Sequence, residues 1–144
     1  MNSDFCLAVH ALVYLNHKQT TVSSEALADN ICTNPARVRR VMAKLRAADL
    51  AAAREGSEGG FRFEKDAAAV TLAAVADALE TRFVAANWHS GSSEKNCRVS
   101  SGMAGVMDGI FLILNSRCSE ALQQITIADI NEQLFGADAE NAHN

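Results

Sequence analysis

Residues 35–48 combine an apolar stripe with a cationic surface, and no other part of the 144-residue chain constrains the fold as strongly. Apolar side chains recur there at the spacing of one helix face. Between residues 36 and 48 there are five cations and no acid, although surface helices usually mix both signs. We therefore expect a helix that packs on one side, with Asn34 as its N-cap and Pro35 at its first position. The stripe consists of Val38, Val41, Met42 and Leu45, and the cations are Arg37, Arg39, Arg40, Lys44 and Arg46.

The segments on either side of this helix add two further elements. Ser23 is an N-cap candidate for a short helix with Ala26 and Leu27 on its inner side, and Asn30 can end that helix in a left-handed conformation. After the cationic helix, residues 55–60 hold three glycines between two short apolar runs, which predicts a two-stranded hairpin. These are the parts of a winged helix-turn-helix, which places its second helix in the DNA major groove and its wing on phosphates or the minor groove.

Positive charge is concentrated in this unit. The net charge of the whole chain is −4, which by itself argues against a polyanionic partner. Residues 37–65, however, carry +4, whereas residues 1–36 carry −2 and residues 66–144 carry −6. Because the local field attracts a polyanion, we expect double-stranded DNA to bind here; a solvated charged helix face is the alternative on charge alone. The candidate DNA-binding residues are Ser24, Asn34, Arg37, Arg39, Arg40, Lys44, Arg54 and Arg62.

The rest of the chain predicts mostly helix. We expect a buried helix over residues 4–17 and another that Thr71 caps and that ends near residue 80. A long helix should begin near Arg98 and run to about residue 124, and its residues 110–114 are apolar on every side. One protomer cannot readily cover such a helix, so a homodimer is the simplest explanation.

The predicted fold class is therefore mainly α (α+β). Thr126 and Asp129 resemble a capping box for a last helix that ends near Phe135. The expected organisation is a winged helix-turn-helix domain over residues 1–80, a loop over 81–97, C-terminal dimerisation helices over 98–135 and a flexible tail over 136–144.

The order of these parts resembles the Rrf2 family of bacterial winged helix-turn-helix transcriptional regulators, over about residues 4–135. The resemblance implies a dimeric regulator, here expected to be a repressor, that binds a promoter palindrome. It also implies that the helix from Pro35 is the recognition helix, that Arg54 and Arg62 belong to the wing, and that the long helix crosses between subunits. The residues that carry it are Val22 to Ala28, Val38, Val41, Met42, Leu45, Arg46, Ala48, Leu50, Gly59 to Phe61, Val70 to Leu72 and Asp77 to Glu80.

Many members of that family hold an iron-sulfur cluster through three closely spaced cysteines in the loop that corresponds to residues 81–104. This chain has one cysteine there, Cys97. Cluster iron needs thiolate or comparable ligands at nearly every site. We therefore expect no cluster and no metal site, and the chain resembles the cluster-free branch of the family.

The four cysteines divide into two pairs. Cys6 and Cys118 lie in dense helical stretches and are expected to be small buried hydrophobes. Cys97 lies at the start of the long helix, where the helix pole and nearby cations favour the reactive thiolate. Cys32 lies in the turn before the cationic helix, where oxidation would move that helix. Cys32 and Cys97 are thus candidates for a redox switch that controls DNA affinity, or else an incidental turn cysteine and an incidental exposed one.

Two other classes of function have less support in the sequence. The four histidines lack zinc spacing, and the chain has no nucleophile elbow and no glycine-rich loop between a strand and a helix, so we expect no enzyme. A regulator that responds to a small molecule or partner protein seated between Trp88, Phe83 and the long helix remains an alternative. No apolar run reaches about 18 residues and no signal peptide is evident, so we expect a cytoplasmic protein with no membrane contact.

Overall fold

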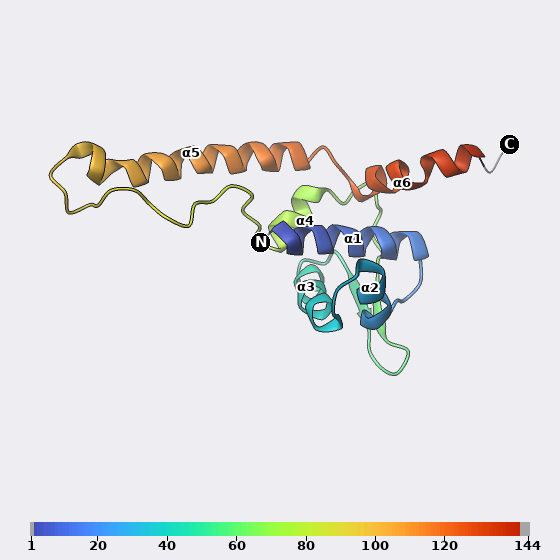
Figure 1. Ribbon diagram of the computed structural model, residues 1–144. Coiled ribbons are helices and arrows are strands. Elements are labelled where there is room, and N and C mark those ends of the chain that lie inside the picture. Colours follow the sequence, from blue (N-terminus) through green and yellow to red (C-terminus); the bar gives the residue numbers. More distant parts are fainter. Residues whose placement is uncertain (1, 142–144) are drawn as a thin grey trace.

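The computed structural model describes residues 2–141, and the side chains of residues 2–136. Within that part of the chain, a winged helix-turn-helix is joined to a long helix that projects away from it (Figure 1). Helix α1 lies in the middle, with α2, α3 and the hairpin on one side of it and α6 on the other. The elements are α1 (Asn2–Lys18), α2 (Ser24–Ile31), α3 (Pro35–Ala47), β1 (Ala52–Arg54), β2 (Gly60–Arg62), α4 (Leu72–Ala78), α5 (Arg98–Leu122) and α6 (Ile127–Asn141).

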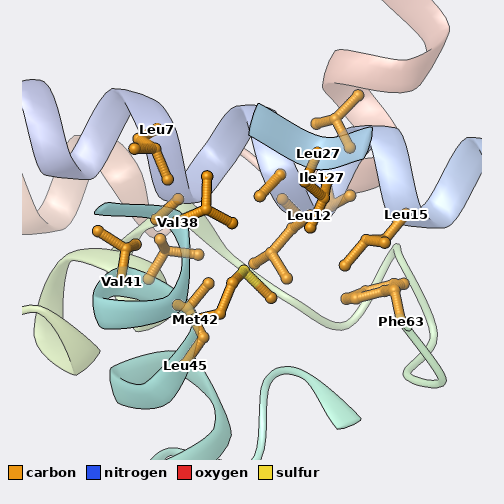
Figure 2. Close-up of a cluster of buried hydrophobic side chains, with 14 of the residues drawn as sticks. Leu7, Leu12, Leu15, Leu27, Val38, Val41, Met42, Leu45, Phe63 and Ile127 are labelled. Carbon is orange, nitrogen blue, oxygen red and sulfur yellow. The ribbon is translucent and has the colours of Figure 1, made fainter. Parts of the chain in front are cut away.

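The hydrophobic core forms where α1, α2 and α3 meet (Figure 2). The four residues of the predicted apolar stripe on α3 are all buried in it, which confirms the helical period read from the sequence. Leu12 and Leu15 of α1 and Leu27 of α2 are fully buried beside them. Phe63, after the wing, and Ile127, at the start of α6, close the core from two other elements, so the domain depends on residues far apart in sequence.

Both helices of the helix-turn-helix begin at the predicted caps. Ser23 Oγ accepts a hydrogen bond from the Ala26 backbone N–H at 3.1 Å, and Asn34 Oδ1 accepts one from the Arg37 N–H at 2.8 Å. Each side chain satisfies a donor that the first helical turn leaves unpaired. The residue at which each of these helices begins is therefore set by its own sequence.

The predicted end of α2 was wrong. Asn30 stays helical, and its Oδ1 lies 2.8 Å from His10 Nε2 of α1, so a tertiary contact accounts for this polar residue. Cys32 instead takes the left-handed conformation, with φ 66°. The Thr33 N–H then donates to the Ala28 carbonyl at 2.9 Å, which closes the helix end as in a Schellman motif. The inner face of α2 is formed by Leu27 and Ala28, and Ala26, predicted to point inward, is exposed.

The wing is a two-stranded antiparallel hairpin, as predicted, with Ala53 opposite Phe61. The second strand also bonds to the segment before α2: the Val22 and Phe61 backbones exchange two hydrogen bonds of 2.8 Å. Gly60 lies against the Val22 carbonyl, where a Cβ atom would collide with it. A glycine is required there because the wing is tied to the entrance of α2.

Helix α5 is almost unsupported within the protomer, and none of its residues is buried. The loop over residues 81–97 runs along it (Figure 1) and is tied to it at three points, of which the one nearest the start of α5 is the hydrogen bond from the Ser92 N–H to the Ser100 carbonyl at 3.0 Å. Asn115 Nδ2 donates to the Val84 carbonyl at 2.7 Å while its Oδ1 accepts from the Val84 N–H at 3.0 Å, and His89 Nε2 lies 2.9 Å from Asp108 Oδ1. By length and composition α5 is apolar enough to cross a membrane, so the expectation that no segment reaches this threshold was wrong.

Helix α6 begins at the predicted capping box. The Thr126 N–H donates to Asp129 Oδ2 at 2.8 Å and the Asp129 N–H donates to Thr126 Oγ1 at 3.1 Å. The helix continues to Asn141, past the predicted end near Phe135, because Gly136 is accommodated within it. The predicted flexible tail over residues 136–144 therefore starts inside a helix, and its last three residues lie outside the described part of the chain.

Candidate nucleic-acid interface

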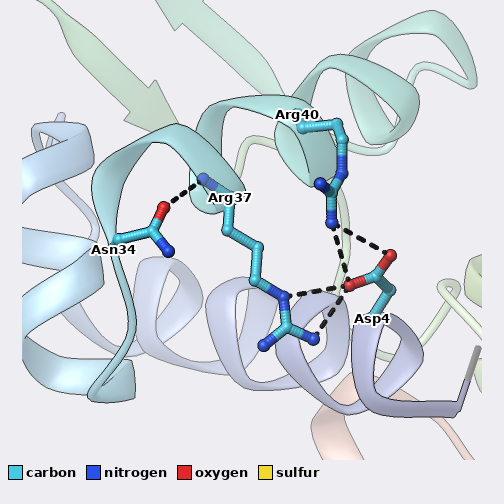
Figure 3. A network of polar contacts seen from close by, with 4 residues as sticks. All are labelled: Asp4, Asn34, Arg37 and Arg40. Atoms are coloured by element: carbon cyan, nitrogen blue, oxygen red, sulfur yellow. Dashed lines mark hydrogen bonds and ion pairs between the residues drawn. The ribbon is translucent and has the colours of Figure 1, made fainter.

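Two arginines of α3 share one carboxylate of α1 (Figure 3). Arg37 donates from Nε at 3.1 Å and from Nη2 at 2.9 Å to Asp4 Oδ1. Arg40 Nη2 lies 3.4 Å from both oxygens of Asp4. The side chains of Asp4 and Arg37 are 24% and 31% exposed, whereas that of Arg40 is 60% exposed. Arg37 is thus held more firmly than Arg40.

Asp4 remains a carboxylate at any ordinary pH. The hydrogen bond from Arg37 lowers the pKa of Asp4 below its usual value, and the charges of Arg40 and Arg37 act in the same direction against partial desolvation. Three charged groups therefore meet at the start of α3 with a net charge of about +1 rather than +2. Asp4 was not among the predicted site residues, because nothing in the local sequence connects it with a helix more than 30 residues later.

Arg39 lies on a different side of α3 and faces α2. Its Nη1 donates to Ser24 Oγ at 3.2 Å and lies 3.5 Å from Glu25 Oε1. These are exposed contacts, which contribute little to stability and can be exchanged for phosphate oxygens. Ser24 and Arg39, both predicted, are therefore brought together at the junction of α2 and α3.

A polar recess of about 410 Å³ lies between the N-terminus of α2 and the wing. Arg46 of α3 and Arg54 of β1 line it, together with Ser24 and the carboxylates Glu25 and Glu55. Neither arginine forms an ion pair with a described residue, and the start of α2 adds its positive pole. Cations beside a helix N-terminus suit a DNA phosphate. Arg46, like Asp4, was not among the predicted site residues, although it follows Arg39 by seven residues and thus shares its face of α3.

The remaining predicted residues are placed less closely together. Lys44 is exposed in the last turn of α3 and makes no ion pair within the described residues. Arg62 points outward from β2 and lies 3.5 Å from Glu64. Asn34 uses its side-chain oxygen to cap α3, so only its Nδ2 group is available to DNA.

The cysteines lie on separate elements. Cys97 is the N-cap residue of α5 and is exposed. The backbone N–H groups of Ser100 and Val99 lower the pKa of its thiol, although Sγ makes no capping hydrogen bond of normal geometry. Cys32 is exposed, as expected of a switch candidate.

The other two cysteines are more accessible than predicted. Cys6 is exposed, because its side of α1 faces an open apolar groove below α6, and Cys118 is only partly buried. Among the described residues, no three side chains of the Cys, His, Asp and Glu types converge as a metal site would require.

The fold and this surface define a class of protein: a winged helix-turn-helix with a cationic second helix is the architecture of a DNA-binding transcriptional regulator. The chain belongs to the Rrf2 family, which is described as an iron-dependent transcriptional regulator and which matches residues 1–133.

Known proteins resemble the chain over nearly its full length. YwnA of Bacillus subtilis, named as an HTH-type transcriptional regulator, is 29% identical over 135 residues, which cover 94% of this chain and 99% of YwnA. The crystal structure of a protein of Lactobacillus plantarum, described as a transcriptional regulator, covers 100% of both chains with a TM-score of 0.82 and 22% identity. CymR, the global cysteine regulator of B. subtilis, has a TM-score of 0.66 and 14% identity over 92% of this chain and 96% of its own.

Proposed function

We propose that the chain is a homodimeric repressor that binds a palindromic operator and whose DNA affinity falls when Cys32 or Cys97 is oxidised. The observation that carries the DNA-binding part is the cationic exposed side of α3 together with the recess at the wing that Arg46 and Arg54 line. Its base-reading residues are expected near the start of α3, and its phosphate contacts at Arg39, Arg46 and Arg54.

The exposed face of α5 supports a homodimer. Val99, Val106, Ile110 and Ile113 follow a heptad-like spacing and are between 43% and 69% exposed. A Cβ atom built on Gly102, Gly105 or Gly109 would meet nothing within 4 Å, so no contact within the described part of the protomer accounts for these glycines. A second copy packed closely along α5 would account for both features.

A second exposed apolar surface also supports a homodimer. The groove between α1 and α6 has a volume of about 700 Å³ and is lined mostly by apolar side chains, including Phe5, Val9 and Leu134. A dimer that covers α5 and this groove would hold two recognition helices in a fixed relation, as a palindromic site requires.

The surroundings of two thiols support control by oxidation. A peroxide would oxidise the Cys97 thiolate to a sulfenic acid and release hydroxide or alkoxide, which takes a proton from solvent, and a second thiol would then displace water from the sulfenic acid to form a disulfide. Cys32 lies in the turn that positions α3, so a substituent on it would displace the recognition helix. Loss of DNA affinity would follow directly.

The alternative, a small-molecule effector beside Trp88 and Phe83, has less support. Trp88 is 76% exposed and lines a recess of about 200 Å³ with Met107 and Phe111, smaller than most ligand sites. Phe83 packs edge-on against Phe5, with ring centroids 5.1 Å apart, and does not share this recess.

The proposed regulator is not an enzyme, holds no iron-sulfur cluster and does not span a membrane. Asp108 lies near the middle of α5, and inserting an aspartate at the centre of a bilayer costs about 2.5–3.5 kcal/mol on insertion scales. A dimerisation helix therefore explains α5 better than a membrane span does. We place the protein in the cytoplasm, where its thiols are reduced until an oxidant reaches them.

A redox-dependent binding experiment tests the proposal. Duplexes enriched by the reduced protein from a random pool serve as probe in a gel shift, with and without peroxide and then dithiothreitol. The wild-type protein should lose and regain DNA binding, whereas Cys32→Ser and Cys97→Ser should each lose less affinity on oxidation than the wild-type protein does, with Cys118→Ser as control. Peroxide-insensitive binding would reject the switch and leave the DNA-binding proposal intact.

A further inference from the structure

The pairing of Asp4 with two recognition-helix arginines is the contact that DNA binding alone leaves unexplained. An arginine binds a guanine edge or a phosphate through a pair of N–H groups on one edge of its guanidinium. The Nε and Nη2 edge of Arg37 is already committed to Asp4 Oδ1, at 3.1 and 2.9 Å. Arg40 gives Asp4 only Nη2, at 3.4 Å, and keeps the rest of its guanidinium exposed.

Asp4 also places a negative charge at the surface that approaches DNA. Non-specific binding consists almost entirely of attraction between protein cations and phosphates, so a carboxylate that engages two cations weakens it directly. Specific binding depends more on where the donors point, and a side chain restrained by Asp4 loses less freedom when it meets the correct base. The two binding modes are thus affected unequally.

We propose that Asp4 is a specificity-determining residue: it holds Arg37 and directs Arg40 so that random DNA is bound weakly and the operator is favoured. Asp4 acts through the two arginines and need not touch DNA itself. This inference rests on the proposed function, because it assumes that α3 reads DNA.

Fluorescence anisotropy with two labelled duplexes tests the inference. One duplex is enriched by the wild-type protein from a random pool, and the other is a scrambled sequence of the same length and composition. Asp4→Asn should bind the scrambled duplex at least about fivefold tighter, with a salt slope steeper by about 1, since roughly one more cation becomes available to phosphate. The affinity for the enriched duplex should rise by a smaller factor, so the ratio of the affinity for the enriched duplex to that for the scrambled duplex should fall.

Asp49→Asn provides a matched control. It removes the same charge from the same domain, but its carboxylate pairs with Lys65 at 2.7 Å, and asparagine tolerates its left-handed backbone. A specificity ratio in Asp4→Asn equal to that of Asp49→Asn would overturn the inference. If Asp4→Asn melts before the assay temperature, Asp4→Ser keeps a residue suited to a helix start and is judged by the same ratio.

The two proposals fail in distinguishable ways. If the wild-type protein enriches no sequence from the pool, the proposed function is wrong and Asp4 has no specificity to determine. If the wild-type protein enriches a sequence and Asp4→Asn discriminates as well as the control, only the role of Asp4 is wrong.

Discussion

Single residues on α3 differ in how free they are to reach DNA. The side chain of Arg40 is 60% exposed and contacts Asp4 through one nitrogen, whereas that of Arg37 donates to Asp4 from two. Exposed pairs contribute little net energy, so Arg40 can leave Asp4 for a phosphate or a base at small cost. The sequence alone identifies the cations of α3, but the carboxylate that holds Arg37 more firmly than Arg40 comes from another helix.

Reversal of the charge at Arg40 should weaken DNA binding. Arg40→Glu is expected to cost about 1–3 kcal/mol of binding free energy and to flatten the salt dependence by about 1 or more, because a contact to phosphate or base becomes a repulsion. Titration of labelled duplex at several salt concentrations measures both effects. Arg82→Glu, an exposed change outside the helix-turn-helix, is the control; full affinity with an unchanged slope in Arg40→Glu would exclude this residue from the interface.

The depressed pKa of Asp4 predicts a pH dependence of stability. A carboxyl whose folded pKa lies below its unfolded value of about 3.9 stabilises the fold fully above that value and loses this contribution as pH falls through the folded pKa. The stability difference between the wild-type protein and Asp4→Asn should be constant near neutral pH and shrink below about pH 4. Urea unfolding at a series of pH values measures it, and a difference that grows on acidification would contradict the assigned contacts.

At the scale of elements, helix starts carry a local signal in the sequence, whereas the left-handed residues that follow helix ends do not. Ser23, Asn34 and Thr71 cap their helices as expected, since an N-cap has a local chemical signature. Four helix ends instead use non-glycine residues at positive φ, which no sequence signal marks: Gln19, Cys32, Asp49 and Glu80. Tertiary contacts, such as that between His10 and Asn30, override the local preference there.

These left-handed residues predict where the fold can be stabilised. Glu80→Gly should raise the free energy of unfolding by about 0.5–1 kcal/mol, because glycine adopts φ 53° without the Cβ clash. Ala43→Gly, an exposed change within α3, should lower it by about 1 kcal/mol. Chemical denaturation of both variants checks the opposite signs, and a loss of stability in Glu80→Gly would mean that its side chain contributes more than its backbone costs.

At the scale of the whole molecule, the protomer is two unequal parts. The winged domain has its own hydrophobic core, whereas the apolar side chains of α5 are exposed to solvent in the protomer. The spacing of apolar residues predicted both the helices of the winged domain and the long helix, because this spacing is a local property of each helix. The burial of Cys6 was wrongly predicted because it depends on how α6 passes α1, which no local pattern reveals.

A charge on the exposed stripe of α5 should prevent dimerisation. Ile110→Glu is expected to yield a monomer that keeps the helix content of the winged domain but loses affinity for a palindromic duplex. Ser101→Glu lies nine residues earlier, roughly opposite on the helix, and should remain dimeric. Light scattering with chromatography measures the mass of each variant, and a dimeric Ile110→Glu would place the interface elsewhere.

The bare face of α5 also bears on how the protein is made. The winged domain leaves the ribosome before residues 98–122 and can complete most of its core alone, so each new chain then carries an uncovered apolar helix until it meets another. Scarce chains meet rarely, and assembly falls as the square of their number. Unpaired chains stay exposed to proteases and chaperones during that time, so a weakly expressed gene should yield disproportionately little of the proposed dimer.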